Sequence, residues 1–114
     1  MSKTSKCINQ LRDDIHNNAK EHGWHDGQRS FGDMIALVHS ELSEALEDYR
    51  NKKLCTEVWT EENGKPCGIP TELADVIIRV LDMCGYYQID IGKIIEQKHE
   101  YNKTRPYRHG NKAI

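Results

Sequence analysis

The sequence has no long apolar segment and no export signal, and each absence excludes a class of protein. No apolar run exceeds a handful of residues, whereas a helix that crosses a bilayer needs roughly 20. The first six residues carry charge without an apolar stretch after them, so we expect no secretory signal and no membrane insertion. The mean hydropathy of -0.79 is polar, yet Leu, Ile and Val recur at regular spacing, which argues against disorder.

Cysteine pairing and strong charge are missing as well. Four cysteines are present, but no two have CxxC spacing, and we expect free thiols in a cytoplasmic protein. The formal net charge of -2 argues against a general affinity for nucleic acid or anionic membranes. At 114 residues, the chain has room for a single domain over 1–114 and none for a second.

The hydrophobic periodicity predicts an all-α fold of four helices. Apolar residues recur at three- and four-residue spacing in four segments. These segments begin near Ser5, Ser30, Thr71 and Asp90, with Thr71 and Asp90 as candidate caps. The first segment stops at Gly23, and the last cannot continue past Pro106.

Residues 54–70 interrupt the helical period between the second and third segments. Within this loop, residues 55–60 are rich in β-prone side chains, and Asn63-Gly64 is a hairpin turn signal. The loop therefore predicts a small β-ribbon or flap beside the helices.

Two pairs of carboxylates, each spaced i, i+3, indicate chemistry on the second and third predicted helices. The pairs are Glu41 with Glu44 and Glu72 with Asp75. At about 100° per residue, Glu41 falls inside the apolar arc of its helix and Glu44 at the edge, whereas Glu47 points away. A carboxylate that faces a core needs a positive partner. A buried Lys or Arg would serve, but several inward acidic groups favour a hard cation, Mg²⁺ or Mn²⁺.

Two other arrangements compete with this metal site. On the third predicted helix, Asp75 and Arg79 lie in the arc left over by the apolar stripe, so a plain surface ion pair between them stays open. A zinc site is not indicated, because His22, His25 and His39 make no ligand set with the cysteine spacings.

Four segments, in this order along the chain, carry a resemblance to a known family. They are Arg29-Ser30-Phe31, Leu37 to Glu47, Gly68 to Arg79, and Tyr101-Asn102-Lys103-Thr104-Arg105-Pro106. The chain resembles the MazG-like all-α nucleoside triphosphate pyrophosphatases over most of its length. Each ExxE or ExxD half is common alone, but both halves in order, followed by Asn-Lys-Thr-Arg-Pro, are specific. The resemblance implies a four-helix bundle-type fold, which we expect homodimerisation to complete.

The resemblance also implies an activity, namely hydrolysis of a nucleoside triphosphate to the monophosphate and pyrophosphate with Mg²⁺, or Mn²⁺ in its place. The implied metal ligands and catalytic carboxylates are Glu41, Glu44, Glu72 and Asp75. Mg²⁺ would neutralise charge on the leaving group and orient a water for in-line attack. Glu44, at the edge of the apolar arc, is our choice to take the proton of that water.

Basic and aromatic residues complete the expected substrate site. The expected phosphate ligands, which lie at the end of the last helix, are Lys98, Asn102, Lys103 and Arg105. A solvated basic tail is the alternative for Lys103 and Arg105. Trp24 and His25 follow the first helix and are expected to contact the base, although Trp24 could equally cover the core.

Other functions stay open to different degrees. A carboxylate-bridged di-iron bundle would need Glu-x-x-His pairs, and neither Glu41 nor Glu72 is followed by His at i+3. A helical binding or regulatory protein could keep the fold without turnover, and intact carboxylates argue against it without excluding it. Nucleic-acid binding through the basic tail is disfavoured by the negative net charge.

Overall fold

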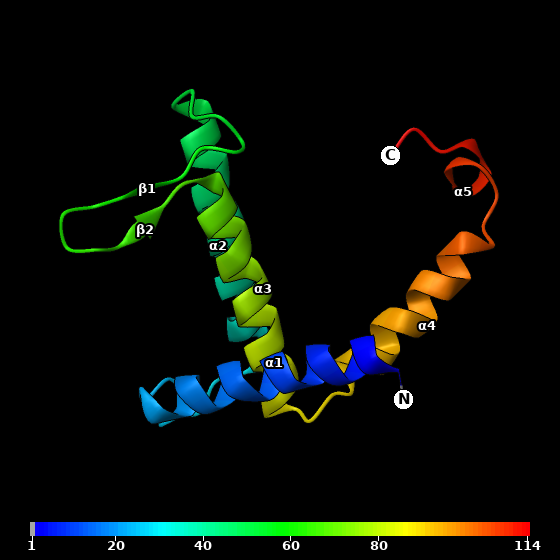
Figure 1. The fold of residues 1–114 in the computed structure, drawn as a ribbon, viewed down its shortest axis with the longest axis horizontal. Coiled ribbons are helices and arrows are strands. Elements are labelled where there is room, and N and C mark those ends of the chain that lie inside the picture. The colour runs from blue at the N-terminus through cyan, green and yellow to red at the C-terminus, as the bar shows by residue number, and fades with distance from the viewer. Residues whose placement is uncertain (1) are drawn as a thin grey trace.

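The computed structural model describes residues 2–114, and its elements follow the predicted order (Figure 1). The long helices are α1 (Lys3–Glu21), α2 (Phe31–Arg50), α3 (Ile69–Tyr86) and α4 (Ile91–Lys103). Two short strands, β1 (Trp59–Thr60) and β2 (Pro66–Cys67), lie between α2 and α3, and a single turn, α5 (Arg108–Asn111), follows α4. The all-α prediction is confirmed. Within residues 2–114, none of the helices combines the length and apolar character that a bilayer crossing requires.

Short-range hydrogen bonds set the starts of two helices where the sequence predicted them. The Ser30 hydroxyl accepts from the Asp33 amide at 3.0 Å, and the Asp33 carboxylate accepts from the Ser30 amide at 3.3 Å. This capping box satisfies two amides that the first turn of α2 leaves free. Asp90 caps α4 in the same way by accepting from the Lys93 amide at 3.2 Å.

The predicted cap of α3 is wrong by one turn. The helix already begins at Ile69, so Thr71 lies inside it and donates its hydroxyl to the Cys67 carbonyl at 3.3 Å. Pro70 permits this earlier start, because the first turn of a helix does not need the amide proton that proline lacks.

A β-ribbon occupies the 54–70 interruption, as predicted, but it is shorter than the β-prone stretch. The two strands are antiparallel, with Trp59 opposite Cys67 and Thr60 opposite Pro66. Proline is tolerated because each strand of a two-stranded ribbon has a free edge. Figure 1 shows the ribbon projecting sideways from the α2–α3 pair, away from α4.

The helices pack in series rather than around one axis. Helix α3 contacts both α2 and α1, and α4 contacts α1. Figure 1 shows α1 crossing one end of the α2–α3 pair. Helix α4 leads away from the N-terminal end of α1 (Figure 1). The buried apolar residues are accordingly few: Met34, Ala45, Ile69, Leu81, Met83 and Cys84.

The first turn of α4 is fastened closely to α1. A Cβ atom on Gly92 would lie 2.3 Å from the carbonyl oxygen of Ser5, so this approach requires glycine. Asn9 adds two hydrogen bonds, one from its amide to the Asp90 carboxylate at 2.8 Å and one from the Gly92 amide to its carbonyl at 2.9 Å. The start of α4 is thus fixed while the rest of the helix projects from the molecule.

One chain is more extended than a compact domain of its length. Its radius of gyration is 16.7 Å, whereas about 13 Å is typical of this length. Its accessible surface is 8718 Å², whereas about 6400 Å² is typical of a monomer of this mass. The large apolar side chains that stay exposed on α2 and α3 include Leu42, Leu46, Leu73, Ile77 and Ile78.

Candidate functional site

Carboxylates from α2 and α3 meet where these helices pack together. Glu41 lies in the middle of α2 and is only 8% exposed, while Glu72 lies in the first turn of α3 and Asp75 one turn later. One carboxylate oxygen from each of these three residues lies within 4.8 Å of the others. Glu44 lies beside the group, because its side chain interacts with both Glu72 and Glu41. We call Glu41, Glu72 and Asp75 the carboxylate cluster.

Arg79 supplies the positive partner that the buried Glu41 needs. Its Nε donates to Glu41 Oε1 at 2.7 Å, and the side chains are 30% and 10% exposed. Burial raises the pKa of Glu41, but the hydrogen bond and charge of Arg79, with further hydrogen bonds in the group, bring this pKa below its ordinary value. The surface pair between Asp75 and Arg79 does not form, because within residues 2–114 the ion-pair partner of Arg79 is Glu41.

Within residues 2–114, the other two carboxylates form no ion pair, although the charge of Arg79 partly offsets the rise in the pKa of Asp75. Burial raises the pKa of Glu72, and the adjacent Glu44 and Glu41 raise it further, to about 7. Burial, followed by the charge of Glu41, also raises the pKa of Asp75. The Oε2 atom of Glu72 is buried without a hydrogen-bond partner in the part of the chain that the structure describes. The single guanidinium of Arg79 therefore leaves the group with excess negative charge.

The donor set fits a hard divalent cation. Every available ligand atom is a carboxylate oxygen, which suits Mg²⁺ or Mn²⁺ and not a softer metal. The unpartnered Glu72 Oε2 is a buried acceptor that a cation would satisfy. Glu41, Glu72 and Asp75 could hold such an ion, and Glu44 is close enough to join them or to contact its water.

A cavity of about 460 Å³ adjoins the carboxylate cluster, a size typical of small-molecule sites. One side of its lining comes from α1 and the loop after it, with Asp14, Ile15, Asn18, Ala19, Trp24 and Arg29. The other side comes from α2 and α3, with Glu41, Asp75, Ile78, Arg79 and Asp82. The cavity thus combines apolar and aromatic surface with two carboxylates of the cluster.

The two residues expected to contact a base lie in different surroundings. Trp24 lines the cavity and is 51% exposed, with the Arg29 guanidinium 5.3 Å from its ring centroid. His25 lines a smaller adjoining pocket, and its Nε2 lies 2.9 Å from Asp82 Oδ1. Trp24 therefore offers its ring to the cavity, whereas one ring nitrogen of His25 is already engaged.

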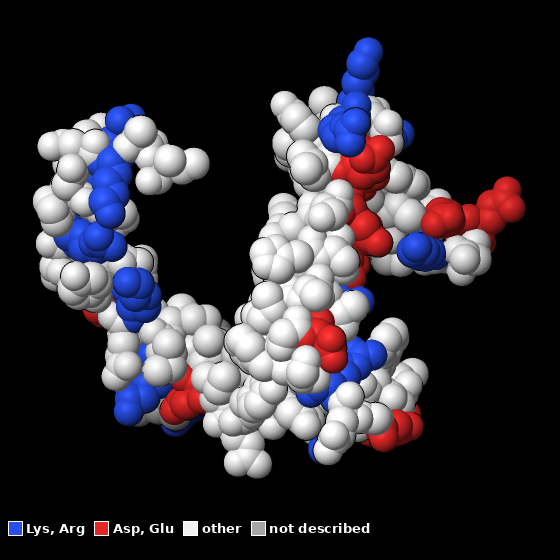
Figure 2. Space-filling view, turned by 180° about the vertical axis from the view of Figure 1, so that it is seen from behind, with Lys and Arg blue, Asp and Glu red and all other residues white. Residues whose placement is uncertain are grey.

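The expected phosphate ligands are separated from the carboxylate cluster within one chain. Lys98, Asn102 and Lys103 lie on the outer part of α4, and Arg105 follows it. Within residues 2–114, no side chain of α4 lines the cavity. Figure 2 shows Lys and Arg gathered along α4 and the tail, while Asp and Glu gather on the α2–α3 pair and the ribbon. Lys98 and Arg105 both lie over the ring of Tyr101, at 5.1 and 5.9 Å from its centroid.

Two acidic residues of the cavity lining, Asp14 and Asp82, were not predicted as site residues from the sequence. Asp75, Arg79 and Asp82 follow each other at i, i+4 and i+7, so they share one face of α3. This spacing was the available signal that Asp82 lies near the carboxylate cluster. No comparable signal shows that Arg79 reaches across to Glu41 on another helix.

Comparisons of the chain with protein-family models, with curated proteins and with solved structures find no match. Membership of the MazG-like family therefore stays a prediction. Function has to be argued from the sequence motifs and from the geometry of the carboxylate cluster and its cavity.

Proposed function

We propose that the chain is a divalent-cation-dependent nucleoside triphosphate pyrophosphohydrolase of the MazG-like type, producing a nucleoside monophosphate and pyrophosphate. One observation carries the proposal: three carboxylates from two helices converge beside a cavity of about 460 Å³ that has an aromatic residue in its lining. The excess negative charge, and the Glu72 pKa raised to about 7, support a site that is completed by a cation. The sequence motifs support the reaction class.

Each residue has a role in this proposal. Glu41, Glu72 and Asp75 hold the cation, Mg²⁺ or Mn²⁺, and Arg79 fixes the orientation of Glu41. A bound divalent cation supplies neutralisation of the phosphate charge and activation of a water. Glu44, which is exposed beside Glu72, accepts the proton of that water. Trp24 offers a face on which the base stacks, with His25 as the second expected base contact.

We infer further that a second copy of the chain completes the fold and the site. The apolar side chains left exposed on α2 and α3, and an accessible surface about 2300 Å² larger than that of a compact monomer, support a homodimer in which the two α2–α3 pairs form a four-helix bundle. The basic segment of α4 lies away from the cavity of its own chain. In the dimer it binds the phosphates held by the partner's carboxylate cluster.

A complementation experiment tests the shared site. Glu41→Gln is expected to form nearly inactive homodimers, and Arg105→Ala to form homodimers with about 1 to 10% of the wild-type activity. If the two residues serve one site from different chains, each mixed dimer has one intact site, and refolding an equal mixture restores about a quarter of the wild-type activity. Activity no higher than that of the parent variants contradicts the exchange of α4, and sedimentation as a 13.2 kDa monomer contradicts the dimer.

The reaction itself is tested with a substrate panel. Purified chain is incubated with NTPs, dNTPs and modified nucleotides in Mg²⁺, and release of pyrophosphate is compared with release of orthophosphate. We expect pyrophosphate release that stops in EDTA. Orthophosphate as the first product, or turnover that is undiminished in EDTA, contradicts the proposal.

A helical binding or regulatory protein without turnover is the second candidate, and one observation favours it. Arg79 already neutralises the most buried carboxylate, Glu41, without any cation. In that case nucleotides raise the melting temperature in the presence of Mg²⁺, yet neither pyrophosphate nor orthophosphate is released. The same substrate panel separates the hydrolase from the binding protein when the melting temperature is measured by calorimetry beside the release of product.

A further inference from the structure

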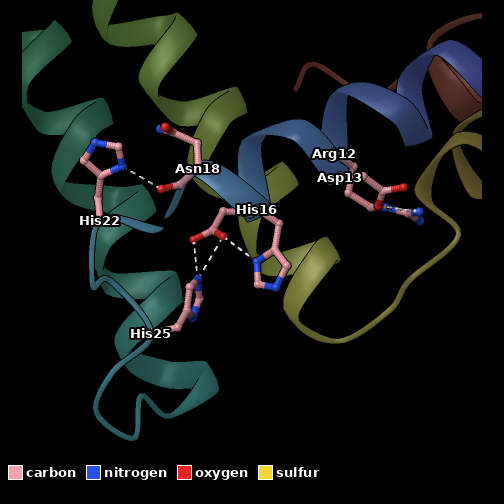
Figure 3. Close-up of polar contacts among 7 residues, drawn as sticks. Arg12, Asp13, His16, Asn18, His22 and His25 are labelled. Atoms are coloured by element: carbon pink, nitrogen blue, oxygen red, sulfur yellow. Dashed lines mark hydrogen bonds and ion pairs between the residues drawn. The ribbon is translucent and has the colours of Figure 1, made fainter. Parts of the chain in front are cut away.

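A second cluster of ionisable groups, apart from the carboxylate cluster, reaches the wall of the cavity through Asp82. His16 of α1, His25 of the following loop and Asp82 of α3 come together from three segments of the chain (Figure 3). His16 Nδ1 lies 2.8 Å from Asp82 Oδ1, and His25 Nε2 lies 2.9 and 3.0 Å from the two carboxylate oxygens. Figure 3 shows the two imidazole rings approaching this carboxylate from different directions. We call these three residues the histidine cluster.

We propose that the histidine cluster binds a first-row transition-metal dication of the Zn²⁺ class. Two imidazoles and one carboxylate form the ligand set of several zinc sites and of non-haem iron sites. Mg²⁺ by contrast prefers oxygen ligands alone. The ion expected here is therefore chemically different from the one proposed for the carboxylate cluster, and this inference does not depend on nucleotide hydrolysis.

The spacing of the ligand atoms supports the assignment. Two ligands that each lie about 2.1 Å from one tetrahedral ion, about 109° apart, are separated by about 3.4 Å. The nitrogen–oxygen separations in the histidine cluster are 2.8 to 3.0 Å, and the ligand atoms of all three residues lie within 4.8 Å of one another. The metal would replace the protons that these nitrogens now share with Asp82, and each nitrogen–oxygen pair would open by about half an ångström to admit it.

The surroundings hold the two rings in place. The side chains of His16 and His25 are only 14% and 9% exposed. The Tyr86 ring stacks on the His25 ring, with centroids 5.1 Å apart and an interplanar angle of 14°. A Cβ atom on Gly85 would lie 2.5 Å from the Cβ of His16, so glycine at this position lets α1 and α3 approach closely enough. Packing around metal-bound histidines of this kind fixes their orientation and favours binding.

A bound ion would tie together three segments that line the same cavity. Asp82 lines both the cavity and the smaller pocket, and Trp24 is the neighbour of His25 in the chain. The ion would therefore stabilise the crossing of α1 over α3 and hold the loop that carries Trp24. Stabilisation of this kind grows with metal concentration, because the ion binds the folded chain in preference to the unfolded one.

Metal titration of the full-length chain tests the proposal. Co²⁺ and Zn²⁺ are titrated in excess Mg²⁺, which occupies the carboxylate cluster, and binding is followed by calorimetry, by visible absorption of Co²⁺ and by the melting temperature. We expect one equivalent to bind to the wild-type chain and to raise its melting temperature. We also expect a Co²⁺ absorption stronger than that of the aqueous ion, since nitrogen ligands and a lower coordination number intensify these bands.

Matched variants identify the ligands. Asp82→Asn and His16→Gln keep the size of the side chain and are expected to weaken Zn²⁺ binding by more than about 100-fold. Circular dichroism shows that each is folded. His22→Gln is the control, because His22 is exposed at the end of α1 and its side chain, within residues 2–114, bonds only to the Asn18 carbonyl (Figure 3). Glu41→Gln is a second control and is expected to bind Zn²⁺ as the wild type does.

Three results would overturn the proposal. The first is a wild-type chain that binds neither Zn²⁺ nor Co²⁺ in excess Mg²⁺, which would leave His16 and His25 as hydrogen-bond donors to Asp82 only. The second is equal affinity in the wild type and in folded Asp82→Asn. The third is loss of Zn²⁺ binding in Glu41→Gln, which would move the ion to the carboxylate cluster.

Discussion

The carboxylate cluster and the histidine cluster border the same cavity but balance their charges in opposite ways. In the carboxylate cluster, three acidic groups, with Glu44 beside them, share one arginine, and Glu72 has a buried oxygen without a partner. In the histidine cluster, the Asp82 carboxylate lies at hydrogen-bonding distance from the imidazoles of both His16 and His25. The carboxylate cluster is electrostatically unfavourable without a bound cation, whereas the polar groups of the histidine cluster are already paired with one another.

This difference indicates different consequences for stability. Like charges held together in a partly buried place raise the free energy of the folded state and persist where binding compensates for them. Complementary groups, such as those of the histidine cluster, lower the free energy of the folded state. An ion of the Zn²⁺ class would add to that stabilisation. Substitution of Glu72 and substitution of Asp82 should therefore change the metal-free stability in opposite directions, while activity should depend most on the carboxylates.

The largest expected effect is on turnover. Glu41→Gln or Asp75→Asn should lower kcat/KM for pyrophosphate release by at least about 100-fold, because each removes a charged ligand of the proposed cation. Glu47→Gln is the matched control, since Glu47 lies on α2 like Glu41, is exposed and, within residues 2–114, forms an ion pair only with Arg50. Rates in the two cluster variants equal to that of the control would remove the carboxylate cluster from the reaction.

The next effect separates phosphate binding from base recognition. Lys103→Ala and Arg105→Ala should lower kcat/KM roughly tenfold to hundredfold for every nucleotide, because each loses a charge-assisted contact to phosphates that all substrates share. Trp24→Ala and His25→Ala should instead change the ranking of purine and pyrimidine substrates. Steady-state kinetics of the four variants decides, with Lys112→Ala as a control for the loss of tail charge. A changed base preference in Arg105→Ala, with uniform slowing in Trp24→Ala, would reverse the assignment.

A smaller effect is expected on the stability of the metal-free protein, measured in EDTA, when the histidine cluster is altered. Asp82→Asn should lower the free energy of unfolding by about 1.5 to 3 kcal/mol, because it replaces a carboxylate that accepts from two imidazoles. Urea denaturation at neutral pH measures this change. Asp13→Asn is the control, since its carboxylate is 57% exposed on α1 and its loss should change stability by less than about 0.5 kcal/mol. Equal changes in the two variants would mean that the histidine cluster contributes nothing beyond a surface pair.

The smallest effect is the pH dependence of the metal-free protein. The pKa of Glu72 rises on folding from 4.5 to about 7, so the folded chain binds more protons than the unfolded chain between these values. The stabilisation is fully present below pH 4.5 and is lost as the pH rises through 7. The raised pKa of Asp75 acts in the same direction, and the lowered pKa of Glu41 in the opposite one.

Melting temperatures in EDTA between pH 5 and pH 8 measure this dependence. We expect the wild type to melt at a lower temperature as the pH rises, and Glu72→Gln to lose most of the slope and to melt a few degrees above the wild type at pH 8. Glu47→Gln should keep the wild-type slope. A Glu72→Gln variant that melts below the wild type at pH 8 would show that Glu72 is not destabilised by its neighbours.

Much of the fold could be predicted because its determinants are local. The helix start near Ser30, the cap at Asp90 and the turn at Asn63-Gly64 each depend on a few adjacent residues, and each was predicted from the sequence. The cap at Thr71 was mispredicted because the helix could begin either at Thr71 or at Gly68, three residues earlier. Pro70 favours the earlier start. The inward position of Glu41 also follows from helical periodicity alone, since the apolar arc of α2 fixes which face is buried.

By itself the sequence determined the helices, the ribbon and the buried position of one acidic residue on α2, because hydrophobic periodicity and capping are read within single segments. Only the tertiary structure decided that Arg79 pairs with Glu41, that His16 and His25 meet at Asp82, and that α4 carries its basic residues away from the cavity. Each of these depends on where α1 crosses α3 and on the direction in which α4 leaves α1. That geometry is set by contacts such as Gly85 with His16 and Gly92 with Ser5, between residues that lie about 70 to 90 positions apart in the chain, and spacing along one helix carries no information about such contacts.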